Sequence, residues 1–238
     1  MKKAIYFSDL GLQDYQKVWD IQEKIFTELI QIKTMNYKLP QCEQIQEFHH
    51  LIFCEHPHVY TLGKSGDEQN LLINQIELQE KDTQFIKTNR GGDITYHGPG
   101  QLVGYPIFDL ESLNLSIKDY IGGIEEAIIK TIAEYGLKGK SADGAIGVWL
   151  DATDDLPERK ICAIGVKVSK HVTMHGFALN INTNLDYYNY INPCGFLDKG
   201  VTSLQKELGK EMDYEEIKQK VKRHLMEMFH LEFDEMED

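Results

Sequence analysis

Residues 160–181 read KICAIGVKVSKHVTMHGFALNI, two apolar runs separated by the polar turn Ser169-Lys170-His171. Apolar runs of this length, rich in β-branched residues and bounded by a polar turn, predict two adjacent antiparallel strands. Lys160 opens the first run, and Asn192-Pro193-Cys194-Gly195 follows the second. We therefore expect a β-hairpin around which the chain is organised, with a lysine at its start and a cysteine beyond its end.

Further strands and helices are expected around this hairpin. Short apolar runs predict strands at 4–7 (at a sheet edge), 51–54, 59–62, 85–88, 102–110 and 145–150. Apolar residues at helical spacing predict a helix from Tyr15 to about Asn36, a second that begins at Ser116 and stops at Gly136, and a third that begins at Asp213. The mixture indicates an α/β fold (mixed α+β).

The 238 residues contain no internal repeat and no linker rich in Gly, Ser or Pro. We therefore expect a single domain over residues 1–238 with one large core, since a chain of this length buries roughly 70% of its unfolded surface. The acidic tail 234–238 is expected to fray.

Composition excludes several classes of protein. The formal net charge of −13 argues against general nucleic-acid binding, which needs a basic face. No apolar run approaches the roughly 20 residues of a membrane span, and the N-terminus turns polar too early for a signal peptide. The four cysteines are widely spaced, which suits reduced thiols. These features indicate a cytoplasmic protein that binds no membrane.

Residues 90–101, RGGDITYHGPGQ, are predicted to form a long loop, because Gly and Pro crowd both of its ends. An ordinary turn and a ligand-holding loop are about equally favoured by the residues alone. Arg90, two adjacent glycines and the polar side chains of Thr95, Tyr96 and His97 could hold a carbonyl or a phosphate. The loop is neither a Walker loop nor a dinucleotide-binding fingerprint.

Cys194 stands between a proline and a glycine, a tight turn that could expose its sulfur. A nucleophilic cysteine needs a cation or base that lowers its pKa, and Lys160 or His175 could supply one. From residue types alone, an unreactive thiol remains the favoured reading. The histidines between His49 and His58 could in principle bind a metal, but no partner cluster is apparent and we predict no metal site.

Four segments together resemble the octanoyltransferases of lipoate biosynthesis in order and in spacing. They are residues 90–106 (RGGDITYHGPGQLVGYP), 160–168 (KICAIGVKV), 175–180 (HGFALN) and 192–195 (NPCG). The similarity is clearest over residues 60–204. It implies the fold of the lipoate and biotin protein ligase catalytic domain, in which a mainly antiparallel or mixed sheet and a smaller sheet are flanked by helices.

The resemblance implies a transferase that takes an octanoyl group from acyl carrier protein onto Cys194 as a thioester. It then passes the group to a lysine of a lipoyl domain, in a 2-oxoacid dehydrogenase or in the glycine-cleavage H protein. Lys160 is implied to lower the pKa of Cys194 and to shuttle protons. No cofactor and no metal is expected, because thioester exchange is nearly balanced and amide formation runs downhill.

The family's acyl pocket maps onto two loop or strand segments and the hairpin. The corresponding residues are Arg90, Gly91, Gly92, Asp93, Ile94, Thr95, Tyr96, His97, Ala163, Ile164, Gly165, Gly176, Phe177 and Ala178. The small residues of the hairpin would leave a slot for an eight-carbon chain. Its depth would set the choice of chain length at about 0.8 kcal/mol per buried methylene.

We also expect the acidic partner proteins to dock on local basic residues, namely Lys138, Lys140, Arg159, Lys167 and Lys170. Three other functions stay open. An ATP-dependent lipoate or biotin protein ligase would share the fold and need no cysteine. A non-catalytic carrier-protein binding module would bury Cys194. A hydrolase that pairs Cys194 with His175 would release free octanoate.

Overall fold

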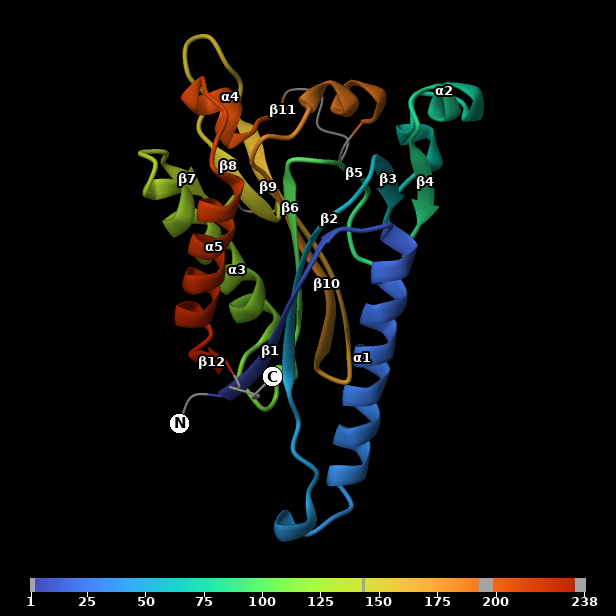
Figure 1. Cartoon of the computed structure of the whole chain (residues 1–238), viewed down its shortest axis with the longest axis vertical. Coiled ribbons are helices and arrows are strands. Elements are labelled where there is room, and N and C mark those ends of the chain that lie inside the picture. The colour runs from blue at the N-terminus through green and yellow to red at the C-terminus, as the bar shows by residue number, and fades with distance from the viewer. Residues whose placement is uncertain (1–2, 143, 193–198, 234–238) are drawn as a thin grey trace.

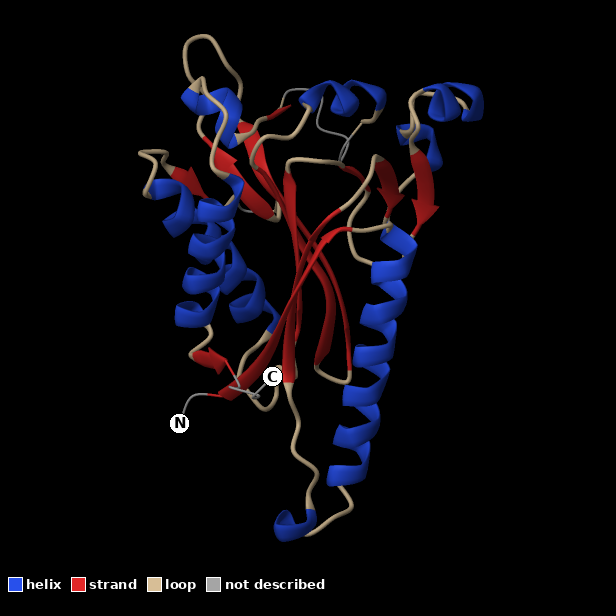
Figure 2. Ribbon diagram, in the orientation of Figure 1, coloured by secondary structure: helices blue, strands red, loops and turns tan. Residues whose placement is uncertain are grey.

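A computed structural model describes residues 3–142, 144–192 and 199–233. Within them the chain forms a large sheet, a small sheet and helices on both faces of the large sheet (Figure 1, Figure 2). The expected mixed α/β class is confirmed. In chain order the elements are β1 Lys3–Leu12, α1 Tyr15–Asn36, η1 Gln41–Glu43, β2 His49–Glu55, β3 Val59–Leu62, η2 Glu68–Asn70, α2 Gln75–Glu80, β4 Gln84–Lys87, β5 Ile94–His97, β6 Gln101–Ile107, α3 Ile117–Ala133, β7 Gly139–Lys140, β8 Gly147–Leu150, β9 Arg159–Ser169, β10 Val172–Asn180, η3 Leu185–Tyr190, β11 Gly200–Val201, α4 Leu204–Leu208, α5 Tyr214–Met228 and β12 Leu231–Phe233.

The large sheet runs in the order β12-β1-β2-β6-β10-β9-β8-β7, with β11 beside β9. Strand β1 pairs in parallel with both β12 and β2, so the expected edge position of residues 4–7 is wrong. The residues that cover this edge belong to β12, at the other end of the sequence. A three-residue strand carries too little pattern to be predicted.

The hairpin predicted from residues 160–181 is confirmed as β9 and β10. The two strands pair antiparallel from Val172 opposite Ser169 to Leu179 opposite Cys162. Lys170 and His171 form the turn and both have positive φ, 49° and 63°. Positive φ at both central residues is the geometry whose twist matches two antiparallel strands. Lys160 thus lies next to the first residue of a central strand.

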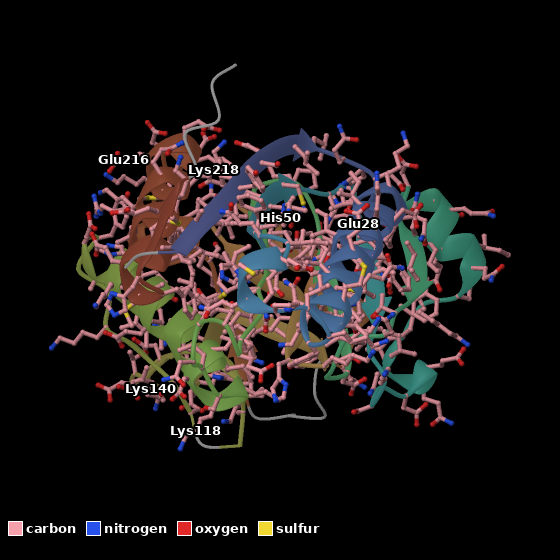
Figure 3. The ribbon with its side chains drawn as sticks, turned by 90° about the horizontal axis from the view of Figure 1, so that it is seen from below. Glu28, His50, Lys118, Lys140, Glu216 and Lys218 are labelled. Carbon is pink, nitrogen blue, oxygen red and sulfur yellow. The ribbon has the colours of Figure 1, made fainter. Side chains whose placement is uncertain are left out.

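Helices cover the two faces of the large sheet unequally. The 22-residue α1 begins at the capping residue Asp14 and packs Val18, Phe26 and Leu29 on one face of the sheet. Helices α3 and α5 cover the other face with the larger apolar cluster. Figure 3 shows the molecule from below, with the exposed charged residues Glu28 on α1, Lys118 on α3 and Glu216 on α5 labelled. Over the ranges described, no helix is both long and apolar enough to span a membrane.

The expected loop at 90–101 needs correction, because residues Ile94–His97 form β5. This strand pairs antiparallel with β3, Leu62 opposite Ile94 and Val59 opposite His97, and β4 pairs with β3 on its other side. The strand has only four residues, and it is flanked by Gly91-Gly92 and Gly98-Pro99-Gly100. Glycine and proline predict turns, so the whole segment was expected to be a loop. The small sheet holds the 90–97 segment above the β9–β10 hairpin.

Several short elements were not expected from the sequence, among them α2, α4, β7 and β11. They have between two and six residues each. A helix of six residues completes fewer than two turns, so it shows no period that could be recognised.

Candidate active site

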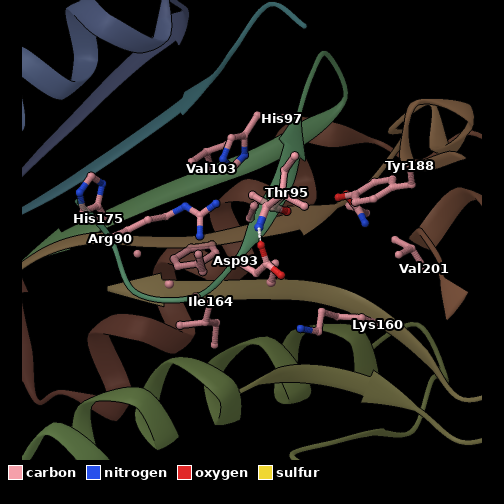
Figure 4. A pocket seen from close by; sticks show the side chains of 18 of the residues that line it. Arg90, Asp93, Thr95, His97, Val103, Lys160, Ile164, His175, Tyr188 and Val201 are labelled. Atoms are coloured by element: carbon pink, nitrogen blue, oxygen red, sulfur yellow. Dashed lines mark hydrogen bonds between the residues drawn. The ribbon is translucent and has the colours of Figure 1, made fainter. Parts of the chain in front are cut away.

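A cleft of about 930 Å³, counting its open mouth, lies between the β9–β10 hairpin and the 90–97 segment (Figure 4). Most of the pocket residues implied by the resemblance line it. They are Arg90, Gly92, Asp93, Ile94, Thr95, His97, Ala163, Ile164, Gly165, Gly176, Phe177 and Ala178. Lys160 lines the same cleft. The structure therefore brings together segments that are some 70 residues apart in the sequence.

Lys160 enters the cleft along the surface of β8. Its stem passes over Gly147, where an added Cβ would lie 3.4 Å from Lys160 Cε. The Nζ atom donates a hydrogen bond to the Ile146 carbonyl at 3.2 Å and lies 4.6 Å from the centroid of the Trp149 ring. Figure 4 shows the ammonium end pointing toward the middle of the cleft. The contacts with Ile146 and Trp149 hold the lysine in place.

Lys199 lies at the same end of the cleft. Its Nζ is 4.7 Å from the centroid of the Trp149 ring and 2.6 Å from Glu158 Oε2. The Glu158 carboxylate also accepts from Lys140 at 2.7 Å, and its hydrogen bonds with these two lysines lower its pKa to about 2. Glu158 is thus a fixed anion that ties Lys199 to the start of β9.

Cys194 lies outside the described residues, between Asn192 and Lys199. On one side, the Asn192 backbone N–H donates to the Asn70 carbonyl at 2.8 Å. On the other side, Lys199, Gly200 and Val201 all line the cleft. The nucleophilic role of Cys194 stays a prediction.

Arg90, the first residue of the 90–97 segment, has a buried side chain that makes hydrogen bonds inside the protein. Its Nη2 donates to the Thr61 carbonyl at 2.5 Å and to Thr61 Oγ1 at 3.0 Å, and its Nη1 donates to the Gly91 carbonyl at 3.0 Å. These bonds hold the segment on β3. They fix the position of the guanidinium group in the cleft wall.

A buried polar network forms another part of the wall. His97 Nδ1 bonds Gln101 Oε1 at 2.8 Å, and Gln101 Nε2 donates to Asn180 Oδ1 at 2.9 Å and to the Tyr188 hydroxyl at 3.2 Å. Burial, and then the neighbouring His56, lower the pKa of His97 to about 3. His97 is therefore neutral at physiological pH and serves as a fixed hydrogen-bonding group.

Two of the implied pocket residues do not line the cleft. The Gly91 N–H donates to the Val166 carbonyl at 2.9 Å, so this residue joins the loop to β9. Tyr96 is fully buried on the other side of the small sheet, where its ring stacks on Tyr187 with a centroid distance of 4.9 Å. Because β5 is a strand, Tyr96 faces away from Thr95 and His97.

The glycines of the hairpin also have a packing role that the sequence did not reveal. A Cβ on Gly176 would lie 2.0 Å from the Gly104 carbonyl oxygen, and a Cβ on Gly165 would lie 3.0 Å from the Gly91 carbonyl oxygen. Gly176 excludes any Cβ because two backbones nearly touch there, and Gly165 leaves room for a Cβ only if the Gly91 segment shifts slightly. They line the cleft, but they do not by themselves open a slot.

The structure adds cleft residues that the sequence analysis did not single out. They are Tyr15, Val103, Tyr105, Trp149, Asn180, Tyr188, Lys199, Gly200 and Val201. Asn180 ends the quoted HGFALN motif, and Val103 and Tyr105 lie in the quoted 90–106 segment, so these three carry a local signal. Trp149 reaches the cleft through strand pairing, opposite Lys160, whereas Tyr15 comes from α1 and Tyr188 from η3.

His175 lies at the opposite end of the cleft from Lys160 (Figure 4). Its Nε2 bonds Asn89 Oδ1 at 2.7 Å, and burial lowers its pKa to about 3. Lys160 and His175 thus stand at different ends of the cleft. Because Cys194 lies outside the described residues, the hydrolase in which His175 activates the cysteine stays an untested alternative.

Among the residues described, no three His, Cys, Asp or Glu side chains gather as a metal site. His56, from the histidine-rich stretch, instead bonds the Gln13 carbonyl at 2.7 Å and the Tyr105 hydroxyl at 2.8 Å. The expected docking surface also needs correction. Arg159 is buried and pairs with Glu207 at 2.6 Å, so it is not part of an exposed basic patch.

Comparisons with known proteins agree with this geometry. The family model described as the lipoyl protein ligase A/B catalytic domain matches residues 14–226. A curated octanoyltransferase of Christiangramia forsetii is 51% identical over 233 residues, which cover 98% of each chain. A curated octanoyltransferase of Cytophaga hutchinsonii is 49% identical over 98% of this chain and 95% of that one.

Solved structures show the same fold at low sequence identity. A bipartite lipoate protein ligase from Thermoplasma acidophilum superposes with a TM-score of 0.70 at 14% identity, over 99% of this chain and 87% of that one. Lipoate-protein ligase A bound with ATP superposes with a TM-score of 0.65 at 13% identity, over 99% and 89%. These two structures confirm the expected catalytic-domain fold.

Proposed function

The chain belongs to the lipoyl protein ligase A/B catalytic domain family and is an octanoyltransferase of lipoate biosynthesis, and we propose that it carries the octanoyl group on Cys194. In this proposal Lys160 is the base and the cation beside the thiol. The acyl chain occupies the cleft between the β9–β10 hairpin and the 90–97 segment. The donor is an acylated carrier protein and the acceptor is a lysine of a lipoyl domain.

One observation carries the proposal. Lys160 and Lys199 meet on the same indole ring at one end of an acyl-sized cleft. Lys199 follows Cys194 by five residues in the sequence. A chain of that length spans at most about 18 Å, which limits how far the sulfur can lie from the cleft. A cysteine can carry an acyl group as a thioester, and a neighbouring base or cation such as a lysine can activate it.

In the first half-reaction, the Cys194 thiolate attacks the carbonyl carbon of the octanoyl thioester on the carrier. A new carbon–sulfur bond forms, the bond to the carrier's sulfur breaks, and the carrier thiolate leaves. The Lys160 ammonium stabilises the thiolate before attack and supplies a proton to the leaving sulfur. One thioester replaces another, so the step is nearly balanced in free energy.

In the second half-reaction, the amine of the acceptor lysine attacks the Cys194 thioester. The amide bond forms, the cysteine sulfur leaves as a thiolate, and the neutral Lys160 amine accepts the proton that the attacking amine loses. Because an amide is more stable than a thioester, the step runs downhill. Lipoyl domains of 2-oxoacid dehydrogenases and the glycine-cleavage H protein are the acceptors that we propose.

The test is to incubate the protein with octanoyl carrier protein, without acceptor, and to measure its intact mass. We expect one octanoyl adduct that hydroxylamine removes, and no adduct in Cys194→Ala. Cys42→Ala is the matched control, since Cys42 is an exposed cysteine outside the cleft and its loss should leave the adduct intact. An adduct that persists in Cys194→Ala would falsify the mechanism.

An ATP-dependent ligase is the second candidate function, because this protein shares its fold with lipoate-protein ligase A. That enzyme class activates a free acid. Incubation of the protein with free octanoate, ATP and a lipoyl domain separates the two functions. We expect no octanoylated lipoyl domain under these conditions and full transfer when octanoyl carrier protein is supplied without ATP.

A further inference from the structure

The two ends of the cleft and its middle differ in chemistry. The middle is apolar, with Val103, Ala163, Ile164, Phe177 and Ala178 among its lining residues. Lys160 and Lys199 mark one end. The other end is formed by buried polar groups, above all His175 and Arg90. An acyl chain that starts at Lys160 therefore runs through an apolar middle toward a polar end wall.

The spacing of the two ends suits a chain of eight carbons. The stem of Lys160 lies over Gly147, which pairs with Ala163 on β9, and His175 pairs with Val166. Three residues along β9 separate these two levels, about 10 Å at ~3.3 Å per residue. An extended eight-carbon chain has seven carbon–carbon bonds of ~1.5 Å and spans about 9 Å.

The Nδ1 atom of His175, at this end of the cleft, is a hydrogen-bond acceptor without a partner among the residues described. The Asn89 amide donates its N–H to Glu23 Oε1 at 2.8 Å, so Asn89 Oδ1 is free to accept, and the 2.7 Å contact requires a proton on His175 Nε2. Nδ1 is then an acceptor without a hydrogen. It is buried and has no hydrogen-bond partner among the residues described. The low pKa of His175 agrees with a neutral ring.

A complementary donor lies on a neighbouring side chain. Gln22 on α1 accepts the His175 backbone N–H at 3.1 Å, while its own Nε2 is buried and lacks a partner in the described part of the chain. Burial raises the pKa of the Tyr105 hydroxyl, and a contact with the Gln22 side chain opposes this shift. The contact falls short of a normal hydrogen bond, so Gln22 Nε2 keeps no hydrogen-bond partner among the residues described. The acceptor and the donor thus belong to two residues in hydrogen-bond contact, of which His175 lines the cleft and Gln22 packs behind it.

The backbone at His175 is held in an unusual conformation. Its φ is +62° inside a strand, a region that residues other than glycine and asparagine rarely occupy. Such a conformation costs free energy and persists only where the surroundings impose it. The hydrogen bonds that His175 donates to Gln22 and Asn89 supply that restraint, and they fix the ring at the end of the cleft.

We propose that His175 and Gln22 form a polar subsite that ends the acyl channel and binds a hydroxyl group, either a water molecule beyond an octanoyl chain or an ω-hydroxyl on the chain itself. A ninth methyl group would displace the water and leave the His175 acceptor unsatisfied. The subsite therefore selects against chains longer than eight carbons. This inference rests on the proposed acyl-transfer function, and it adds the residues that would determine which acyl chain length the enzyme accepts.

Two acyl groups of equal length test the subsite. Nonanoyl and 8-hydroxyoctanoyl carry the same number of non-hydrogen chain atoms, and they differ in a terminal methyl or hydroxyl. Loaded on carrier protein, 8-hydroxyoctanoyl should have a kcat/KM about tenfold above that of nonanoyl with the native protein. An equal or lower value would overturn the proposal.

His175→Gly removes the acceptor and keeps a residue that tolerates positive φ. We expect it to abolish the preference for the hydroxyl and to raise the decanoyl to octanoyl ratio of kcat/KM at least tenfold. Gln22→Met, which removes the Nε2 donor and also the Oε1 that accepts the His175 N–H, should shift both ratios in the same direction by a smaller factor. Unchanged ratios in both variants would contradict the subsite.

His230→Gly is the matched control, because His230 also has positive φ (52°) but is exposed at the end of α5. Its ratios should equal those of the native protein. The outcome is separable from that of the proposed function. A native protein that transfers octanoyl normally while His175→Gly leaves every ratio unchanged refutes the subsite alone, whereas a native protein that forms no thioester refutes the transfer mechanism.

Discussion

Lys160 and Lys199 direct their ammonium groups at the same indole ring, 4.6 Å and 4.7 Å from the centroid of Trp149. The two nitrogens are therefore less than about 10 Å apart. Ring and cations attract each other, and Trp149 is buried, so both lysines are restrained by one rigid side chain. This end of the cleft thus has two lysines, of which the sequence analysis pointed to Lys160.

The second cation should affect the reactivity of Cys194. Lys199→Gln removes a positive charge within about 10 Å of Lys160, worth about 0.5–2 kcal/mol at such distances. We expect alkylation of Cys194 by iodoacetamide at neutral pH to slow two- to tenfold, because the thiolate loses part of its stabilisation. Lys118→Gln, at an exposed position on α3, serves as the control. Equal alkylation rates in both variants would mean that Lys199 has no electrostatic role.

Gly147 allows Lys160 to reach the cleft. Its φ is +126°, and an added Cβ would lie 2.5 Å from the Cys162 carbonyl oxygen as well as against the lysine stem. Gly147→Ala should lower the free energy of unfolding by about 2 kcal/mol and reduce acyl-enzyme formation at least tenfold. Gly122→Ala is the opposite case, since nothing lies within 4 Å of that Cβ and alanine favours a helix. Urea unfolding and adduct kinetics should separate the two variants. Similar behaviour would show that Gly147 is not needed.

Stability should fall as the pH drops below about 6.5. Burial lowers the pKa of His97 to about 3 and that of His56 to about 4, against 6.5 in the unfolded chain. Between about pH 6 and pH 4.5 the unfolded state therefore binds one proton more than the folded state at each of these histidines. The free energy of unfolding should fall by ~1.4 kcal/mol per pH unit for each of them. His97→Gln should flatten the slope by one proton in urea unfolding across this range. His171→Gln, at an exposed turn, should leave it unchanged. The same slope in both variants would contradict a neutral buried His97.

Local pattern sufficed for part of the fold. The hairpin around Lys170-His171 and the helix that begins at the Ser116–Asp119 capping box could be predicted, because their signals lie within a few consecutive residues. Strand β5 could not, since four residues between glycines show no clear period. The edge position of β1 failed for another reason. It depends on residues 231–233, which are far away in the sequence.

The residues of the site likewise fall into those that a local motif predicts and those that only strand pairing brings together. Lys160 and the 90–97 segment carry motifs, so the resemblance identified them. Trp149 comes to Lys160 through the pairing of β8 with β9, whose register shifts between Val148 and Trp149. A shift of this kind changes which side chain faces the cleft, and nothing local in the sequence records it. Lys199 likewise depends on the parallel pairing of β11 with β9.

The buried pair of Arg159 and Glu207 links β9, which carries Lys160, to Thr202, which lies three residues after Lys199. Arg159 Nε and Nη2 donate to the two carboxylate oxygens at 2.6 Å and 2.7 Å, and Thr202 Oγ1 donates to the same carboxylate at 2.5 Å. The Thr202 N–H in turn donates to the Lys160 carbonyl at 2.9 Å. Glu207 therefore joins the first residues of β9 to the segment that follows Lys199.

Glu207→Gln should cost about 3–5 kcal/mol of unfolding free energy, because it leaves the Arg159 guanidinium buried without its counter-charge. It should also slow acyl-enzyme formation, since Lys160 and Lys199 lose a common anchor. Glu227→Gln is the control, because its exposed pair with Arg223 spans 3.9 Å and is worth at most about 0.5 kcal/mol. Urea unfolding at pH 7 and intact-mass kinetics measure the two effects. If Glu207→Gln lost stability but formed the adduct at the native rate, the pair would hold the fold together without positioning the lysines.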